Sequence, residues 1–172
     1  RHERPGVYSS YDASGITSAG RAAKRIGVAA LAVKGTANAV VTLTGYGAGV
    51  EAFGEDQAGA PGMSTLLKLL FANGASTVYA VRVGDDRDLA AYQAAFAALN
   101  NCDAQIIVCD SSTLNIQKAL KNAVETASSA RGERIGVIGG DGDTAAELVT
   151  RAAAINSERM VLVGPDMKDE SG

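Results

Sequence analysis

The clearest strand signal in the chain is Thr77-Val78-Tyr79-Ala80-Val81-Arg82-Val83, which is rich in β-branched and aromatic residues. Three further apolar runs follow it at residues 104–109, 134–138 and 160–163, with a segment of helical periodicity between each pair. Strands that are apolar throughout and alternate with helices are typical of a parallel sheet covered on both faces. The sequence therefore predicts an α/β fold, a mostly parallel sheet with helices on both faces, preceded by an extended N-terminal arm.

The helices between these strands are expected from caps and from apolar stripes. Candidate N-caps are Asp88, Ser111 or Ser112, and Asp143 or Thr144, the last of which fits a capping box with Glu147. The stripes at helical spacing are Leu89, Tyr92, Phe96 and Leu99; Ile116, Leu120, Val124 and Ala127; and Leu148, Ala152 and Ile155.

The N-terminal half adds one helix and two strands to this pattern. A helix begins at Met63, where apolar residues recur at positions 63, 66, 67 and 70, and it ends at Gly74. Strands are expected at residues 26–33 and 40–44. The glycine-rich run 45–49 interrupts the pattern, and residues 51–61 are expected to be mostly loop.

Composition excludes several classes of protein. The chain has 172 residues, 47% of them apolar and 20% charged, which fits one globular domain rather than a disordered chain. The net charge is −3, so the chain lacks the basic excess that an electrostatic binder of nucleic acid needs. No apolar run reaches the roughly 18 residues of a membrane span. We therefore expect no direct contact with nucleic acid and no membrane insertion.

Cysteine and histidine are too scarce for the commonest catalytic and metal sites. If the segment between Cys102 and Cys109 is extended, the two lie roughly 23 Å apart, which is too far for a disulfide, and their spacing matches no zinc motif. The single histidine is His2, and no Gly-x-Ser-x-Gly nucleophile elbow exists. The sequence therefore predicts neither a catalytic residue nor a cofactor.

Two patterns nevertheless suggest ligand chemistry. Gly45-x-Gly47-x-Gly49 departs from the dinucleotide-binding fingerprint, because its sixth position is Val50, and we interpret it as a loop. Aspartates follow several predicted strand ends, where ligands of open α/β sheets bind: Asp85, Asp86, Asp110, Asp141 and Asp143. Helix caps and turns explain these residues best. The alternative is a Mg²⁺-dependent phosphoryl-handling or nucleotide-binding enzyme that uses Asp85, Asp110 and Asp141.

Charge is distributed unevenly along the chain. Residues 1–34 hold six basic residues and two acidic ones, while the whole chain carries −3, so the remainder is acidic. A basic leading segment on an acidic body suits head-to-tail docking between copies of one chain. A solvated tail explains the same asymmetry equally well.

Four segments, taken in order, resemble the sheath proteins of contractile phage tails and of the related phage-tail-like bacteriocins. They are Arg4-Pro5-Gly6-Val7-Tyr8; Gly35-Thr36-Ala37-Asn38 with the Val-rich strand after it; residues 73–83, Asn-Gly-Ala-Ser-Thr-Val-Tyr-Ala-Val-Arg-Val; and residues 156–165, Asn-Ser-Glu-Arg-Met-Val-Leu-Val-Gly-Pro. The resemblance implies a structural subunit, not an enzyme, that polymerises around an inner tube and contracts to drive it through a target cell envelope.

The resemblance also implies partners, a location and an arm. The partners are identical sheath subunits, the inner tail tube protein and the baseplate. The location is the virion tail, or a phage-tail-like particle, assembled in the cytoplasm of the bacterial host. Members of this family link subunits through an N-terminal arm, which by position consists of Arg4, Pro5, Gly6, Val7, Tyr8, Ser9 and Ser10.

Three parts of the chain are expected. Residues 1–25 form the extended arm and its linker, and residues 26–165 form the α/β core domain. Residues 166–172 are a charged exit linker into a C-terminal part that the family has and this sequence lacks.

Overall fold

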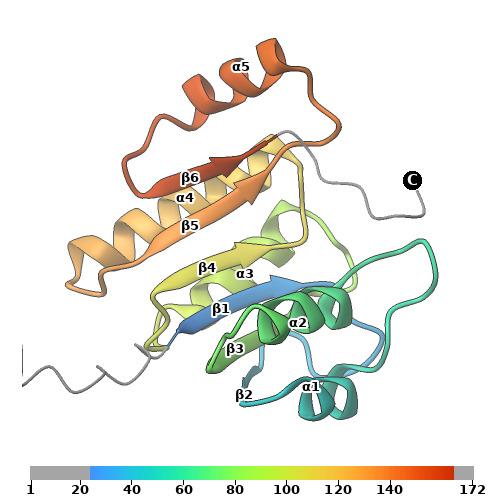
Figure 1. Ribbon diagram of the computed structural model, residues 1–172. Helices are drawn as coiled ribbons and strands as arrows, with labels where there is room; N and C mark the ends of the chain where they lie inside the picture. Colours follow the sequence, from blue (N-terminus) through green and yellow to red (C-terminus); the bar gives the residue numbers. More distant parts are fainter. Residues whose placement is uncertain (1–23, 165–172) are drawn as a thin grey trace, which may run out of the picture.

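A computed structural model describes residues 24–164 of the chain (Figure 1). Its elements, in order, are β1 Arg25–Ala30, β2 Val40–Leu43, α1 Tyr46–Phe53, α2 Met63–Ala72, β3 Thr77–Arg82, α3 Leu89–Leu99, β4 Ile106–Cys109, α4 Leu114–Ser129, β5 Ile135–Gly139, α5 Ala145–Ile155 and β6 Met160–Val163. The α/β fold with a mostly parallel sheet is confirmed. The predicted arm, residues 4–10, and the exit linker, residues 166–172, lie outside the described residues.

The six strands form one sheet in the order β2-β3-β1-β4-β5-β6. Every neighbouring pair is parallel except β2 and β3, which are antiparallel. Nine residues without a helix join β1 to β2, and a parallel crossover needs a dozen or more. The short connection therefore sends β2 back in the opposite direction.

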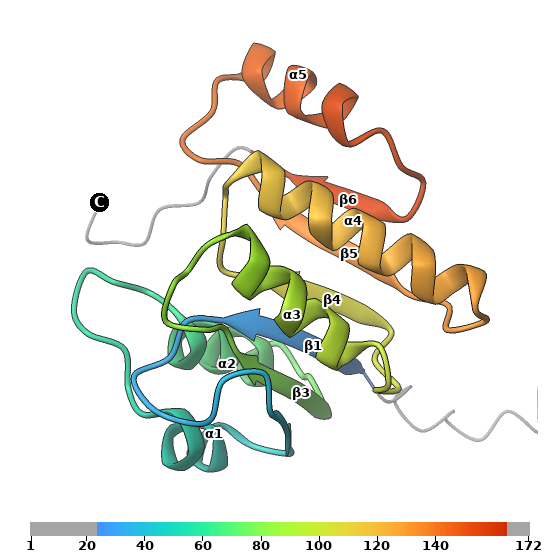
Figure 2. The ribbon, with the colours of Figure 1, turned by 180° about the vertical axis from the view of Figure 1, so that it is seen from behind.

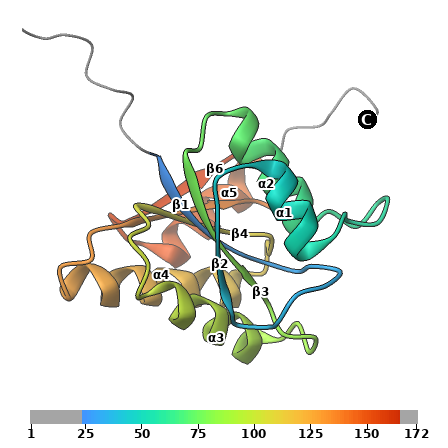
Figure 3. The same cartoon turned by 90° about the horizontal axis from the view of Figure 1, so that it is seen from below.

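Strand β1 lies in the middle of the sheet and is buried on both faces. Val28 packs with the core under α1 and α2, whereas Ala29 packs with the core under α3 and α4, and neither side chain is exposed. Figures 2 and 3 show these two helical layers on opposite sides of the sheet. At Gly27 a Cβ atom would lie 2.6 Å from Cδ1 of Ile107, so glycine lets β4 pack closely against β1.

Helix α1 is a correction to the sequence analysis, which expected no helix in residues 45–61. Its glycines favour a helix poorly, but tertiary packing overrides that preference. Gly49 is buried against α2, and a Cβ atom there would lie 2.5 Å from Cδ1 of Leu67. Phe53 is buried in the same core, and Gly54 ends the helix with a positive φ of 78°, which glycine adopts more readily than other residues.

Two of the three predicted N-caps are confirmed and one is shifted. Asp88 caps α3 by accepting a hydrogen bond from the Ala91 N–H at 2.8 Å, and Thr144 and Glu147 form the predicted capping box of α5. Helix α4 begins after Thr113 instead of Ser111 or Ser112. The Ser111 hydroxyl accepts the Thr113 N–H at 3.2 Å, so it organises the turn that precedes the helix.

Helix α5 does not bury the stripe that its sequence predicts. Ile155 is buried, Leu148 is half-buried and Ala152 is exposed. The helix packs on α4 with little contact to β5 or β6, and Figure 2 shows it standing beyond β6. A gap of about 390 Å³, lined partly by Ile138, Ala152 and Met160, lies between α5 and the sheet.

Polar contacts hold α5 in this position. Arg151 pairs with Asp143 at 2.6 Å and donates to the Ser112 carbonyl at 2.7 Å. It also donates to Oε1 of the fully buried Gln117 at 3.1 Å, and Nε2 of Gln117 donates to the Gly139 carbonyl at 2.9 Å. This network joins α5 to α4 and to the ends of β4 and β5.

The guanidinium of Arg134 closes the end of α3. It is 6% exposed and donates to the carbonyls of Leu99, Cys102 and Gly132, each at 3.1 Å. A cation is favourable there because the last carbonyls of a helix have no partner within the helix and carry partial negative charge.

None of the helices in the described part of the chain is long and apolar enough to cross a bilayer.

We expect Arg134→Met to destabilise the domain by about 2–4 kcal/mol, because it leaves several buried carbonyls without a donor. Urea unfolding of the two proteins measures the difference. Lys118→Met is the matched control, because it removes one positive charge from an exposed position on α4 and should change stability little. An equal loss of unfolding free energy in the two variants would show that the Arg134 hydrogen bonds contribute nothing beyond the charge of the side chain.

Candidate functional site at the carboxyl edge of the sheet

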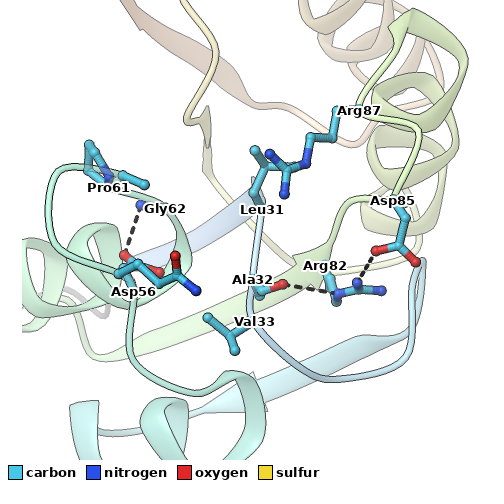
Figure 4. Close-up of a pocket in the computed structure, with 11 residues that line it drawn as sticks. Leu31, Ala32, Val33, Asp56, Pro61, Gly62, Arg82, Asp85 and Arg87 are labelled. Atoms are coloured by element: carbon cyan, nitrogen blue, oxygen red, sulfur yellow. Dashed lines mark hydrogen bonds and ion pairs between the residues drawn. The ribbon is translucent and has the colours of Figure 1, made fainter.

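The carboxyl ends of β1, β3 and β4 meet where the strand order reverses, since β3 lies on one side of β1 and β4 on the other. Ligands of open α/β sheets bind at such a point. A cleft of about 400 Å³ opens there, and Figure 4 shows its walls. Residues that line it include Leu31, Asp56, Gly62, Arg82, Asp85 and Arg87.

Asp110 ties three elements together at this edge. Its carboxylate accepts the Leu31 N–H after β1 at 2.7 Å and the Tyr92 hydroxyl on α3 at 2.6 Å. Burial raises the pKa of Asp110, although both hydrogen bonds favour the ionised form. Burial, together with the hydrogen bond to Asp110, raises the pKa of Tyr92, so its hydroxyl remains a donor. Asp110 therefore holds together β1, β4 and α3 at the point where the strand order reverses.

Asp56 occupies the N-terminus of α2, which is a natural anion site. Its Oδ2 accepts the N–H groups of Gly62 and Thr65 and the Thr65 hydroxyl, all at 2.8 Å, and the Ser64 hydroxyl accepts the Asp56 N–H at 2.9 Å. Burial alone would raise the pKa of Asp56, but these bonds outweigh it and lower the pKa below its ordinary value of 3.8. An external anion would have to displace this carboxylate.

The arginines of the cleft line its opposite wall. Arg82, at the end of β3, forms an ion pair with Asp85 and donates through Nε to the Ala32 carbonyl at 3.3 Å. Arg87 extends along the cleft beside Leu31 (Figure 4). The Arg82 contacts join the loops after β1 and β3.

The aspartates that the sequence singled out do not converge on one point. Asp85 pairs with Arg82, Asp110 accepts from Leu31 and Tyr92, and Asp143 pairs with Arg151, which lowers the Asp143 pKa. Asp86 and Asp141 are exposed. Within residues 24–164, no group of three or more His, Cys, Asp or Glu side chains is placed to hold a metal ion. The Mg²⁺ site of the alternative hypothesis is therefore not assembled in this part of the chain.

The two cysteines are free, as predicted from their spacing. Burial raises the pKa of Cys109 to about 11 and also raises the pKa of Cys102. Both side chains are therefore thiols at neutral pH, which is the unreactive form.

Sequence reasoning missed several of the residues that organise this edge. Asp56 lies in a loop, six residues before the N-cap Gly62, and no capping rule connects positions so far apart. Gln117 and Arg151 lie on two helices, and only the packed fold brings them together. A polar residue within an apolar stripe, such as Gln117 beside Ile116, was the one available signal.

Comparison with solved structures finds the same fold in a contractile assembly. The anti-feeding prophage helical sheath in its contracted state aligns over 94% of this chain, with a TM-score of 0.58 and 16% identity. A chain in the anti-feeding prophage baseplate, 6-fold symmetrised, aligns over 94% with a TM-score of 0.57 and 17% identity. No protein-family profile and no curated protein matches the sequence.

These matches establish a sheath-like fold. At this identity they do not extend to a shared activity. The chain covers 45% and 46% of the two matched chains, so it spans less than half of their length. The predicted arm residues lie outside residues 24–164, and their role stays a prediction.

We expect the stability lost in Asp56→Asn to depend on pH. The folded state lowers the pKa of Asp56, so the ionised carboxylate adds stability above 3.8, and that contribution disappears as pH falls through the lower folded value. The difference in unfolding free energy between parent and variant, measured with urea, should therefore be largest near neutral pH, at about 1–3 kcal/mol. It should become smaller below about pH 4.

Asp86→Asn is the matched control, because it removes the same charge from an exposed position. Its melting temperature at neutral pH should stay close to that of the parent. A gap for Asp56→Asn that stays constant down to pH 2 would contradict the capping role.

Proposed function

We propose that this chain is the α/β core part of a contractile-sheath subunit. It polymerises with identical subunits around an inner tube, and contraction of the polymer drives that tube through a target envelope. The body is a rigid building block without a catalytic site. The observation that carries the proposal is the likeness of 94% of the chain to a helical sheath in its contracted state.

The hydrogen bonds within the carboxyl edge support a structural role. Asp56 takes the N-terminal donors of α2, and Asp110 takes donors from the β1 end and from α3. A nucleotide-binding or phosphoryl-handling enzyme needs those donors for its ligand. Using them inside the protein stiffens the body, which suits a subunit that must move as a rigid unit when a sheath contracts.

The arm assigned to Arg4–Ser10 supplies the link between subunits in this proposal. An extended segment added to the sheet edge of a neighbour forms main-chain hydrogen bonds, which depend little on side chains. Such links can persist while the bodies they join rotate against each other. The basic excess of residues 1–34 favours approach to an acidic neighbouring body.

A baseplate position is the second candidate, because the match to the baseplate chain is almost as good as the match to the sheath. Antibody labelling of intact particles separates the two roles. A sheath subunit is labelled along the whole tail, whereas a baseplate component is labelled only at its end.

Deletion of residues 1–10 from the full-length subunit should leave the fold intact and abolish ring or tube polymers, because the body then has no strand to donate. Electron microscopy of assembly reactions measures the polymers, and circular dichroism with thermal melting checks the fold. Normal polymers formed by the deletion variant would contradict the arm assignment.

Titration with Mg²⁺ and nucleotides should give no binding heat at millimolar concentrations, because Asp56, Asp85 and Asp110 already have protein partners and the described residues hold no cluster of carboxylates suited to a metal ion. Isothermal calorimetry measures this. Saturable binding that is lost in Asp110→Asn would support the alternative, an enzyme that uses Asp85, Asp110 and Asp141.

A further inference from the structure

Within residues 24–164, one half of one sheet face has no helix over it. The side chains concerned are all β-branched and aliphatic and come from three neighbouring strands: Ile106 and Val108 of β4, Ile135 and Val137 of β5, and Val161 and Val163 of β6. We call this set the open face. Val161 is 45% exposed and Val163 is 53% exposed.

Strand register places these six residues on one side of the sheet. Ile106 pairs with Ile135, Val108 with Val137, Val137 with Val161, and Gly139 with Val163. Paired residues of neighbouring strands point to the same face. Ile106 and Val108 pack at the margin of the core under α1 and α2, so the open face is the continuation of that side.

The two sides of the sheet are covered differently. On one side α3 packs on β3 and β1, and α4 packs beside it on β5. On the other side α2 packs on β1 and β3, and α1 packs on β2. In Figure 1, β5 and β6 lie in front of α4 and β4 lies in front of α3, with no helix drawn before these three strands. Parallel strands are normally covered on both faces, so this half-layer is incomplete.

The width of the open face matches one α-helix. Packed helices lie about 8–10 Å apart, and two strand spacings span about 9.6 Å. A helix packed beside α2, which lies on β1 and β3, would therefore lie over β4 and β5. That is the position, on the other side of the sheet, at which α4 packs beside α3.

The flank of α2 that borders the open face carries apolar side chains that a neighbouring helix could contact. Leu69 is 56% exposed, and Leu66 is half-buried. A cleft of about 320 Å³ lined by both leucines, Cys109 and Gly139 lies between α2 and the ends of β4 and β5. The incoming helix would thus meet apolar side chains below it and along one flank.

The 172 residues contain no unused segment that could supply this helix. Residues 165–172 have four charged side chains and one large apolar one, Met167. Residues 1–23 contain only two large aliphatic residues, Val7 and Ile16. Neither segment carries an aliphatic stripe at i, i+3, i+4 and i+7. The matched sheath chain, however, has more than half of its length outside the aligned region.

We propose that the open face binds one amphipathic α-helix, contributed by the portion of the same sheath subunit that this sequence does not include. This inference rests on the proposed function. The helix carries an aliphatic stripe toward β4–β6 and Leu69 and a polar surface toward solvent. Its docking joins the α/β core to the remainder of the subunit, so that the two parts turn as one body.

The test compares Val161→Asp in the 172-residue chain and in the polypeptide of natural length isolated from particles. In the natural-length protein the aspartate would be buried without a partner, and the melting temperature should fall by roughly 5 °C or more. In the 172-residue chain the fall should be clearly smaller, because the residue faces solvent. Val161→Thr keeps the β-branched shape and should give a weaker effect in the same direction.

Val149→Asp is the matched control, because Val149 is 70% exposed on α5 and lies off the open face. It should have little effect in either protein. Bis-ANS, a probe of exposed apolar surface, should fluoresce with the 172-residue chain, less with its Val161→Asp variant, and weakly with the natural-length protein.

Three results would overturn the proposal. The first is an equal effect of Val161→Asp in the two proteins. The second is an intact natural mass of 17.5 kDa, because no polypeptide would then remain to supply the helix. The third is a dimer of the 172-residue chain in sedimentation that Val161→Asp dissociates and Val149→Asp does not, which would assign the face to a second copy.

Polymer formation is scored separately by electron microscopy. If Val161→Asp destabilises the natural-length protein but that protein never forms tubes, the sheath function is refuted and the proposed helix docking still stands. Tubes that form from a protein insensitive to Val161→Asp would refute the helix and keep the function.

Discussion

The burial of β1 on both faces is the constraint on which the rest of the structure depends. Val28 and Ala29 point in opposite directions, and neither reaches solvent. Two helical layers must therefore form, and each must span the strands beside β1. Gly27 adds a close approach to Ile107 that draws β4 against the central strand. Since β1 also separates β3 from β4, the same strand creates the switch point at the carboxyl edge.

The carboxyl edge belongs to a fold often used for ligand binding, but here its polar groups mainly bind one another. Its strongest donors and acceptors are directed at one another: Asp56 at the N-terminus of α2, Asp110 at Leu31 and Tyr92, and Arg82 at Asp85. The Asp110 contacts join elements that are distant in sequence, whereas the Asp56 and Arg82–Asp85 contacts organise local loops. Together with the Arg82 bond to the Ala32 carbonyl and the Met63 N–H bond to the Leu31 carbonyl, these contacts connect β1, β3, β4, α2 and α3.

Both proposals place the working surfaces of the protein away from this edge. The proposed arm consists of residues 4–10, at the start of the chain, and the open face consists of residues of β4, β5 and β6 on the side that α2 only half covers. The gap beneath α5 lies at the same end of the sheet as the open face. On this side of the sheet, α1 and α2 cover β1, β2 and β3. The uncovered strands are β4, β5 and β6, and β6 is the last element that the structure describes.

Local patterns were enough to predict the strands from residue 77 onward, the helices between them and two of the caps. Their apolar periodicity and cap spacing depend on neighbours in sequence, and Asp88 and Thr144 act within one helical turn of the residues they cap. Helix α1 was beyond such rules, because its glycines oppose a helix and tertiary packing of Gly49 and Phe53 stabilises it. The expected burial of the α5 stripe failed for the same reason. An apolar stripe shows which side of a helix is apolar, but not whether another element covers that side.

The amino-acid order alone was sufficient for the α/β class, the direction of most strands and the absence of a cysteine bridge, because these follow from period, crossover length and separation along the chain. Three-dimensional packing was needed to show that Asp85, Asp110 and Asp141 are held apart, that Asp56 caps a helix it precedes by a whole loop, and that half of one sheet face stays bare. These features depend on distances between segments that are remote in sequence, and no local pattern contains those distances.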